Sequence, residues 1–111
     1  MEPIYELQAN VLRMLANPRR LEILHVLADG PLEVGRLATR LNTSQPNVSQ
    51  HLALLRAHGL VDVERNGREV RYRLADPEVM TACEIMRGFL ERRIGRLSNV
   101  TARAALETQH A

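Results

Sequence analysis

The 111-residue sequence has one cysteine, no tryptophan, one phenylalanine and two tyrosines. A single cysteine excludes a disulfide within the chain and a metal site made of several cysteines from one chain. No apolar run approaches the roughly 20 residues that a helix needs to cross a bilayer, so no membrane partner is expected. Residues 1–6 lack the basic and apolar segments of a secretory signal peptide. We therefore expect a cytoplasmic protein.

Because aromatic residues are scarce, aliphatic side chains must build the core. The 45% apolar and 25% charged residues are typical of a globular chain. This length suffices for one domain with its own core, or for one subunit of an oligomer. We therefore predict a single domain over residues 1–111.

Lysine is also absent, and the positive charge is unevenly distributed. Residues 36–75 contain seven arginines and three acidic residues, whereas residues 1–35 have an excess of acids and residues 76–111 are balanced. Guanidinium groups bind phosphate and guanine in bidentate fashion. The central segment is therefore the one best suited to an anionic partner.

Within that segment, a short helix that opens at Ser44 has two chemically different sides. Ser44 can cap it, and Pro46 suits its first turn. Val48, Leu52 and Leu55 form one apolar stripe at helical spacing. The polar side chains around that stripe are Ser44, Gln45, Asn47, Ser49, Gln50 and, at its edge, His51. This acid-free surface suits base edges and nearby phosphates, so it predicts a DNA recognition helix rather than a plain surface helix.

Helical spacing of apolar residues predicts three earlier helices, over residues 4–15, 19–28 and 33–41. Only Asn42 and Thr43 separate the third of these from the polar helix. Two short helices joined by so short a turn indicate a helix-turn-helix.

A basic hairpin follows the polar helix. Apolar and polar residues largely alternate on both sides of Asn66-Gly67, which is a strong hairpin signal because both residues tolerate positive φ. Arg65 and Arg68 flank the tip. A basic hairpin directly after a helix-turn-helix indicates a winged helix, with the wing on a neighbouring groove or on the DNA backbone.

From Asp76 and Pro77 the pattern becomes helical again, with an apolar stripe at nearly heptad spacing. Its predicted interface residues are Val79, Cys83, Met86, Leu90, Ile94 and Leu97. The stripe extends to residue 100 and spans about 33 Å, which is too long for the core of one small domain to cover. We therefore predict a homodimer formed through residues 2–16 and 77–101, with residues 106–111 as a flexible tail.

Three segments carry a resemblance to a known family. They are residues 15–24 (LANPRRLEIL), residues 44–52 (SQPNVSQHL) with the exit Gly59-Leu60-Val61, and the wing residues 65–68 (RNGR) followed by Tyr72. Together they resemble the ArsR/SmtB family of winged-helix transcriptional repressors, over roughly residues 8–100. The resemblance implies a mainly α winged helix-turn-helix fold with a small β-hairpin. It also implies a homodimer that binds an inverted repeat in a promoter and is released when a ligand or a thiol modification is sensed.

The sequence departs from the family members that bind metals. Glu33 and Gly35 stand where the family has a Cys-x-Cys on its third helix. On the last helix, Glu78, Phe89 and Arg92 stand where the family has ligands. Phenylalanine and arginine cannot coordinate Zn²⁺. We therefore expect no metal site and no cofactor, and the inducer stays unidentified.

Two residues keep more than one interpretation. Cys83 is a small buried hydrophobe, a thiol switch that pairs across the dimer, or a metal ligand with unidentified partners. His51 either contacts DNA or holds its helix against the core.

The sequence shows no Gly-rich phosphate loop, no His-Glu-x-x-His and no nucleophile with an orienting base. We therefore expect no enzymatic activity. A winged helix that contacts protein or RNA remains an alternative, although the basic wing and the acid-free helix argue against it. The sequence predicts a sequence-specific, dimeric DNA-binding regulator, with repression favoured over activation. Both modes need only a DNA-bound dimer.

Overall fold

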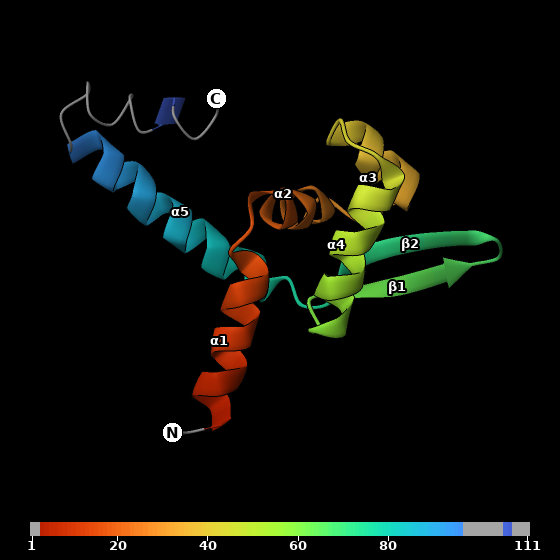
Figure 1. Cartoon of the computed structure of the whole chain (residues 1–111), viewed down its shortest axis with the longest axis horizontal. Coiled ribbons are helices and arrows are strands. Elements are labelled where there is room, and N and C mark those ends of the chain that lie inside the picture. Colours follow the sequence, from red (N-terminus) through yellow and green to blue (C-terminus); the bar gives the residue numbers. More distant parts are fainter. Residues whose placement is uncertain (1–2, 97–105, 108–111) are drawn as a thin grey trace. The chain divides into compact units, whose positions relative to one another are not determined.

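The computed structural model describes residues 3–96 and 106–107. Along the chain, its elements are α1 (Pro3–Leu15), α2 (Pro18–Leu27), α3 (Val34–Arg40), α4 (Gln45–Ala57), β1 (Val61–Asn66), β2 (Glu69–Leu74) and α5 (Glu78–Arg96) (Figure 1). They form two compact units, Met1–Pro77 and Glu78–Ala111. The helices and the two-stranded antiparallel hairpin confirm the predicted fold class.

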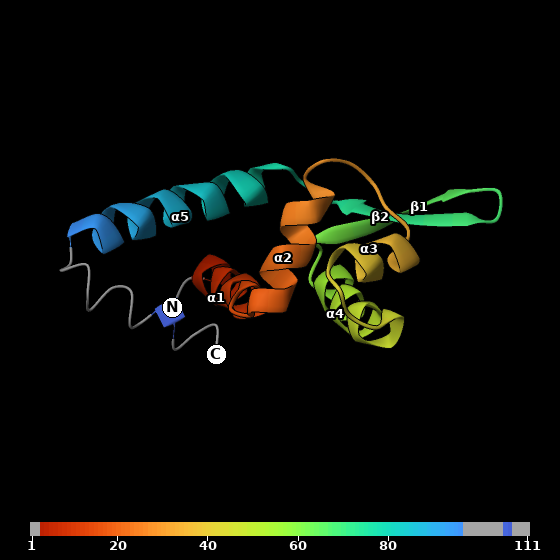
Figure 2. The same cartoon turned by 90° about the horizontal axis from the view of Figure 1, so that it is seen from above.

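The core of the first unit is aliphatic and is shared by α2, α3, α4 and β1. In Figures 1 and 2, α4 lies beside both α2 and α3. The buried side chains are Ile23, Leu24 and Leu27 from α2, Leu37 and Ala38 from α3, Val48, Leu52 and Leu55 from α4, Leu60 from the loop and Val61 from β1. None of the fully buried side chains among the described residues is polar or charged. The predicted stripe of α4 is therefore confirmed as its core side.

Side-chain and backbone caps set the ends of α3 and α4. The Ser44 hydroxyl accepts a hydrogen bond from the Asn47 N–H at 3.2 Å, which confirms Ser44 as the N-cap of α4. Asn42 adopts a left-handed conformation with φ of 54° and ends α3. The N–H of Thr43 then donates to the carbonyl of Ala38 at 3.0 Å, which closes a Schellman motif. The same motif ends α4 at Gly59, with φ of 73°.

The tip of the hairpin differs by one residue from the prediction. Asn66 pairs with Glu69, so Asn66 ends β1 and the two turn residues are Gly67 and Arg68. Gly67 has φ of 65°, whereas neither Asn66 nor Arg68 has a positive φ. Positive φ at the first turn position alone is the pattern of a type II′ turn, which favours glycine there. Arg68 therefore occupies the tip itself and does not flank it.

A backbone contact that the sequence did not predict attaches the hairpin to the loop between α2 and α3. The N–H of Leu32 donates to the carbonyl of Tyr72 at 3.0 Å, and the N–H of Tyr72 donates to the carbonyl of Leu32 at 2.8 Å. At the base of the hairpin, the Ala75 N–H donates to the Leu60 carbonyl at 3.1 Å. These hydrogen bonds fix the hairpin to Leu32 in the loop before α3 and to Leu60 before β1.

The described part of the second unit is α5 together with residues 106–107. The exposed large apolar residues of α5 are Ile85, Met86, Phe89 and Leu90. Leu97, the rest of the predicted dimerisation segment up to residue 101, and residues 108–111 of the predicted tail lie outside the described residues. No helix of the described chain is both long and apolar enough to span a membrane.

Two leucines of α4 provide a matched test of the core. Leu52 is 0% exposed and Leu54 is 44% exposed. We expect Leu52→Ala to lower the free energy of unfolding by about 2–5 kcal/mol, because it removes buried methyl groups and leaves a cavity. Leu54→Ala should cost less than about 1 kcal/mol. Urea denaturation at one protein concentration measures both, and equal losses would contradict this assignment of the core.

Candidate nucleic-acid interface

The solvent side of α4 carries short polar side chains on a rigid base. Gln45, Ser49 and Gln50 are exposed, as is Ser44 at the cap. On the opposite side, the three stripe residues of α4 are completely buried. Because a helix buried along one side cannot rotate about its axis without exposing its stripe, the polar side is held in a fixed direction. This surface is therefore the candidate for contact with base edges.

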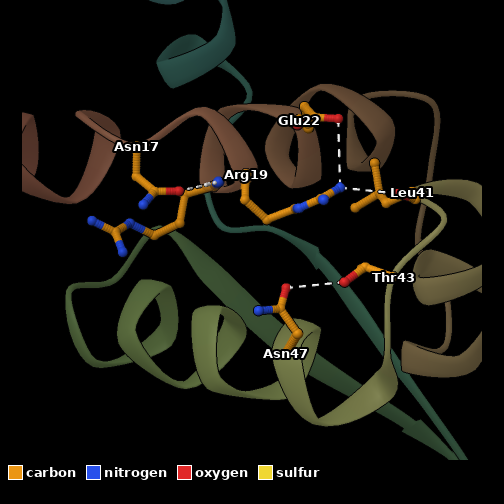
Figure 3. A network of polar contacts seen from close by, with 7 residues as sticks. Asn17, Arg19, Glu22, Leu41, Thr43 and Asn47 are labelled. Atoms are coloured by element: carbon orange, nitrogen blue, oxygen red, sulfur yellow. Dashed lines mark hydrogen bonds and ion pairs between the residues drawn. The ribbon is translucent and has the colours of Figure 1, made fainter. Parts of the chain in front are cut away.

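Asn47 is half-buried and has a structural role at the helix-turn-helix. Its Oδ1 accepts a hydrogen bond from the Thr43 hydroxyl at 3.3 Å (Figure 3). Its backbone N–H is the one that Ser44 caps. Asn47 therefore helps to hold the turn. Its side-chain nitrogen, Nδ2, takes no part in the hydrogen bond with Thr43.

His51 lies at the side of the polar surface and is half-buried. Its Nδ1 is fully buried and has no hydrogen-bond partner. Burial lowers the pKa of His51, and the positive charges of Arg20 and Arg19 lower it further. The imidazole is therefore held neutral next to the start of α2. This placement favours the interpretation that His51 supports α4 over one in which it lies centrally in a DNA groove.

Two arginines at the start of α2 hold the ends of neighbouring helices. Arg19 Nη1 donates to the carbonyl of Leu41, at the end of α3, at 2.9 Å and lies 3.7 Å from the carboxylate of Glu22 (Figure 3). Arg20 Nε donates to the carbonyl of Met14 near the end of α1 at 2.5 Å. Carbonyls at a helix C-terminus carry partial negative charge, so guanidinium groups stabilise them. The sequence pattern alone assigned no role to these arginines, although both lie in the resembling segment 15–24.

The arginines of the hairpin fall into two groups. Arg71 lies 2.7 Å from Glu69, and Arg73 lies 3.9 Å from Asp62 and 4.0 Å from Glu64. Arg65 and Arg68 are exposed, and neither takes part in an ion pair among the described residues. The two arginines predicted to bind DNA are therefore those whose charge is not neutralised within the hairpin.

Sequence reasoning missed further exposed residues beside this surface. Ala53 and Arg56 follow Ser49 at steps of four and seven on α4, so they extend its exposed side. Arg36 and Arg40 are exposed on α3. Their exposure could have been found from the helical period alone.

Cys83 is half-buried in α5. Burial and the neighbouring carboxylate of Glu84 raise the pKa of its thiol, which lowers the thiolate fraction at neutral pH. This shift weakens the thiol-switch interpretation. Within the described part of the chain, no group of three or more His, Cys, Asp or Glu residues is placed to hold a metal ion.

Of the other predicted interface residues, Met86 and Leu90 are exposed, whereas Val79 and Ile94 are half-buried. Ile85 and Phe89 are exposed too but lie outside the predicted stripe.

The burial of His51 predicts a pH dependence of stability. Its pKa is lowered in the folded state, so below about pH 6.5 the unfolded chain binds more protons than the folded one. Stability should therefore fall as the pH decreases from 7 to 5. His51→Gln should make that fall shallower, because it removes the group whose pKa is lowered on folding. Urea denaturation between pH 5 and 8 measures the slopes, and identical slopes for wild type and His51→Gln would refute the effect.

Comparison with known proteins agrees with this geometry. The family described as "Bacterial regulatory protein, arsR family" matches residues 17–63, from the cap of α2 into β1. The transcriptional activator HlyU of Vibrio cholerae is 45% identical over 76 residues, which cover 68% of this chain and 70% of HlyU. The biofilm growth-associated repressor of Agrobacterium fabrum is 38% identical over 78 residues, which cover 70% of this chain and 67% of the repressor.

A solved structure from Mycobacterium bovis resembles the chain over most of its length. It is described as a homodimeric winged helix-turn-helix DNA-binding domain of a possible ArsR-family transcriptional regulator. The match covers 85% of this chain and 87% of the M. bovis chain, with a TM-score of 0.77 and 30% sequence identity. The chain belongs to the ArsR family of bacterial regulatory proteins and is a winged-helix DNA-binding regulator of transcription.

Proposed function

We propose that two copies of this chain form a dimer that binds an inverted-repeat operator and represses transcription from that promoter. The observation that carries the proposal is the acid-free polar side of α4, which stands on a completely buried stripe. Repression requires only that the bound dimer block access to the promoter. Neither a catalytic step nor a cofactor is part of this function.

Gln45, Ser49 and Gln50 are the proposed base readers, because their side chains are exposed and can both donate and accept hydrogen bonds. Ser44 and Asn47 lie at the start of α4, where they suit contacts to the backbone beside the groove. His51 belongs at the edge of this surface, where its buried Nδ1 limits its role to the outward part of its ring.

Arg65 and Arg68 are the proposed contacts of the wing with the DNA backbone or the minor groove. Their support is the absence of an acidic partner in the described chain, together with the position of Arg68 at the tip. The attached base of the hairpin limits the freedom of the wing, so these charges approach DNA from a defined direction.

The proposed dimer interface combines α1 with α5. No residue of α1 is fully buried, and Ile4, Tyr5, Leu7 and Leu12 are 55–62% exposed. The exposed residues of α5 supply a second apolar surface. The domain from M. bovis, which is described as homodimeric, supports a dimer but does not specify the helices that form it. Two-fold symmetry then requires half-sites about one helical turn, or a multiple of it, apart.

The direction of regulation is a separate part of the proposal, since the relatives are named as an activator and a repressor. No feature of the described chain supports a particular inducer. The raised pKa of the Cys83 thiol argues against sensing by that thiol. A reporter fused to the bound promoter tests repression, which predicts higher expression when the chain is absent.

Two arginines of one hairpin test the proposed DNA contact. Arg68→Ala should lower the slope of log K against log salt by about 0.9 for each phosphate that Arg68 neutralises. Arg73→Ala is the matched control, because Arg73 lies near two acids of its own hairpin and should change the slope less. The measurement is binding to a promoter fragment across a salt series. An unchanged slope shows that Arg68 does not bind phosphate, and no binding by the wild type at low salt favours the protein-contact alternative.

A charged residue in the exposed stripe tests the dimer. Leu90 is 46% exposed, so Leu90→Glu should leave the folded chain intact but should place a carboxylate in the proposed apolar interface. Light scattering at several concentrations should then show a monomer. Thr81→Glu, at an exposed position outside the stripe, should remain dimeric. If Leu90→Glu stays dimeric as well, the interface lies elsewhere.

A further inference from the structure

The amide of Gln45 lies close to Gly35 of α3. A Cβ atom added to Gly35 would be 3.1 Å from Gln45 Nε2 and 3.8 Å from Gln45 Cδ. The first distance is shorter than the 3.4–4 Å of ordinary van der Waals contact. Both residues line a hollow of about 340 Å³ between α3 and the start of α4. The other residues of this hollow are Ala38, Thr39, Asn42 and Thr43.

The backbone itself does not require glycine at this position. Three glycines have a positive φ, namely Gly30, Gly59 and Gly67, and Gly35 is not among them. Glycine inside a helix is less favourable than alanine, and α3 has only seven residues. A structural benefit must therefore come from the space that the missing side chain leaves, and the amide of Gln45 borders that space.

We propose that Gly35 is a positioning residue for base reading, because its bare backbone sets where the amide of Gln45 lies in the groove. The inference rests on the proposed function, in which Gln45 reads a base. A glutamine recognises adenine through its carbonyl oxygen and its amide nitrogen together, so both atoms must be correctly placed. Contact with α3 restricts a side chain that has three rotatable bonds, which lowers the entropy lost when DNA binds.

A side chain at position 35 would push this amide away by a few tenths of an ångström. The remaining contacts of α4 with the core would not change, because the stripe residues lie on its opposite side. Gly35→Ala should therefore alter the recognition of one base pair without a general loss of DNA binding.

The experiment is a double-mutant cycle with Gly35→Ala and Gln45→Ala. The probe is the duplex that the wild type selects from a random library, together with duplexes substituted at each position of a half-site. Gln45→Ala should identify its base pair by a loss of discrimination of roughly five- to 150-fold at one position. Gly35→Ala should reduce discrimination at that same position by roughly two- to tenfold. In the Gln45→Ala background, Gly35→Ala should have no further effect.

The base pair affected by Gln50→Ala is the internal control, since Gln50 has no contact with Gly35 and its discrimination should persist in Gly35→Ala. The thermal midpoint of Gly35→Ala should equal or exceed that of the wild type, because alanine favours the helix. If the midpoint falls instead, Gln45→Ala should restore it, since that change removes the crowded amide.

Three results would overturn the inference. Gly35→Ala could retain full discrimination, it could weaken every position equally, or its effect could simply add to that of Gln45→Ala. If Gln45→Ala alone changes no base preference, the assignment of Gln45 as a base reader fails first, and the inference fails with it. The result for Gln45→Ala alone therefore separates failure of the proposed function from failure of the positioning role of Gly35.

Discussion

The burial of three side chains on one side of α4 is the constraint on which the rest of this site depends. Val48, Leu52 and Leu55 are all 0% exposed and pack within an aliphatic core that includes Leu24 and Leu37. Each such side chain contributes about 1.5–3 kcal/mol when it is removed from water. A helix cap contributes about 1 kcal/mol. Packing therefore outweighs capping in holding α4, and it decides which side of the helix faces solvent.

The buried stripe fixes the rotation of α4 about its own axis. Other contacts fix the position of the turn from which α4 starts. The left-handed Asn42 turns the backbone sharply between α3 and α4, and Thr43 bonds across that turn to Asn47. The guanidinium of Arg19 donates to the carbonyl of Leu41 at the end of α3. This hydrogen bond connects α2 to the turn. The side chains that support the polar helix thus come from three segments, and they leave its N-terminal residues exposed.

Period and capping chemistry were enough to predict the helices, the turn at Asn42 and the side of α4 that faces solvent, because those features depend on neighbours in the sequence. The tip of the hairpin was wrong by one residue, since Asn66-Gly67 and Gly67-Arg68 both suit a two-residue turn and only the strand register decides between them. The bridge from Leu32 to Tyr72 and the contact between Gly35 and Gln45 join distant residues. No local pattern encodes such contacts. The burial of His51 Nδ1 likewise depends on packing and could not be predicted from neighbouring residues.

The arginines show why a count of charges predicts a binding surface only approximately. Arg19 donates to a helix-end carbonyl, and Arg73 lies close to two acids, so much of their charge is engaged within the fold. Arg65 and Arg68 have no such partner in the described chain and are exposed. Because exposed charges are screened within about 10 Å at 0.1 M salt, a phosphate responds mainly to those guanidinium groups that can reach it. The positive charge available to DNA is therefore set by which arginines the fold leaves unpaired, and two of them are Arg68 at the tip of the hairpin and Arg65 in β1.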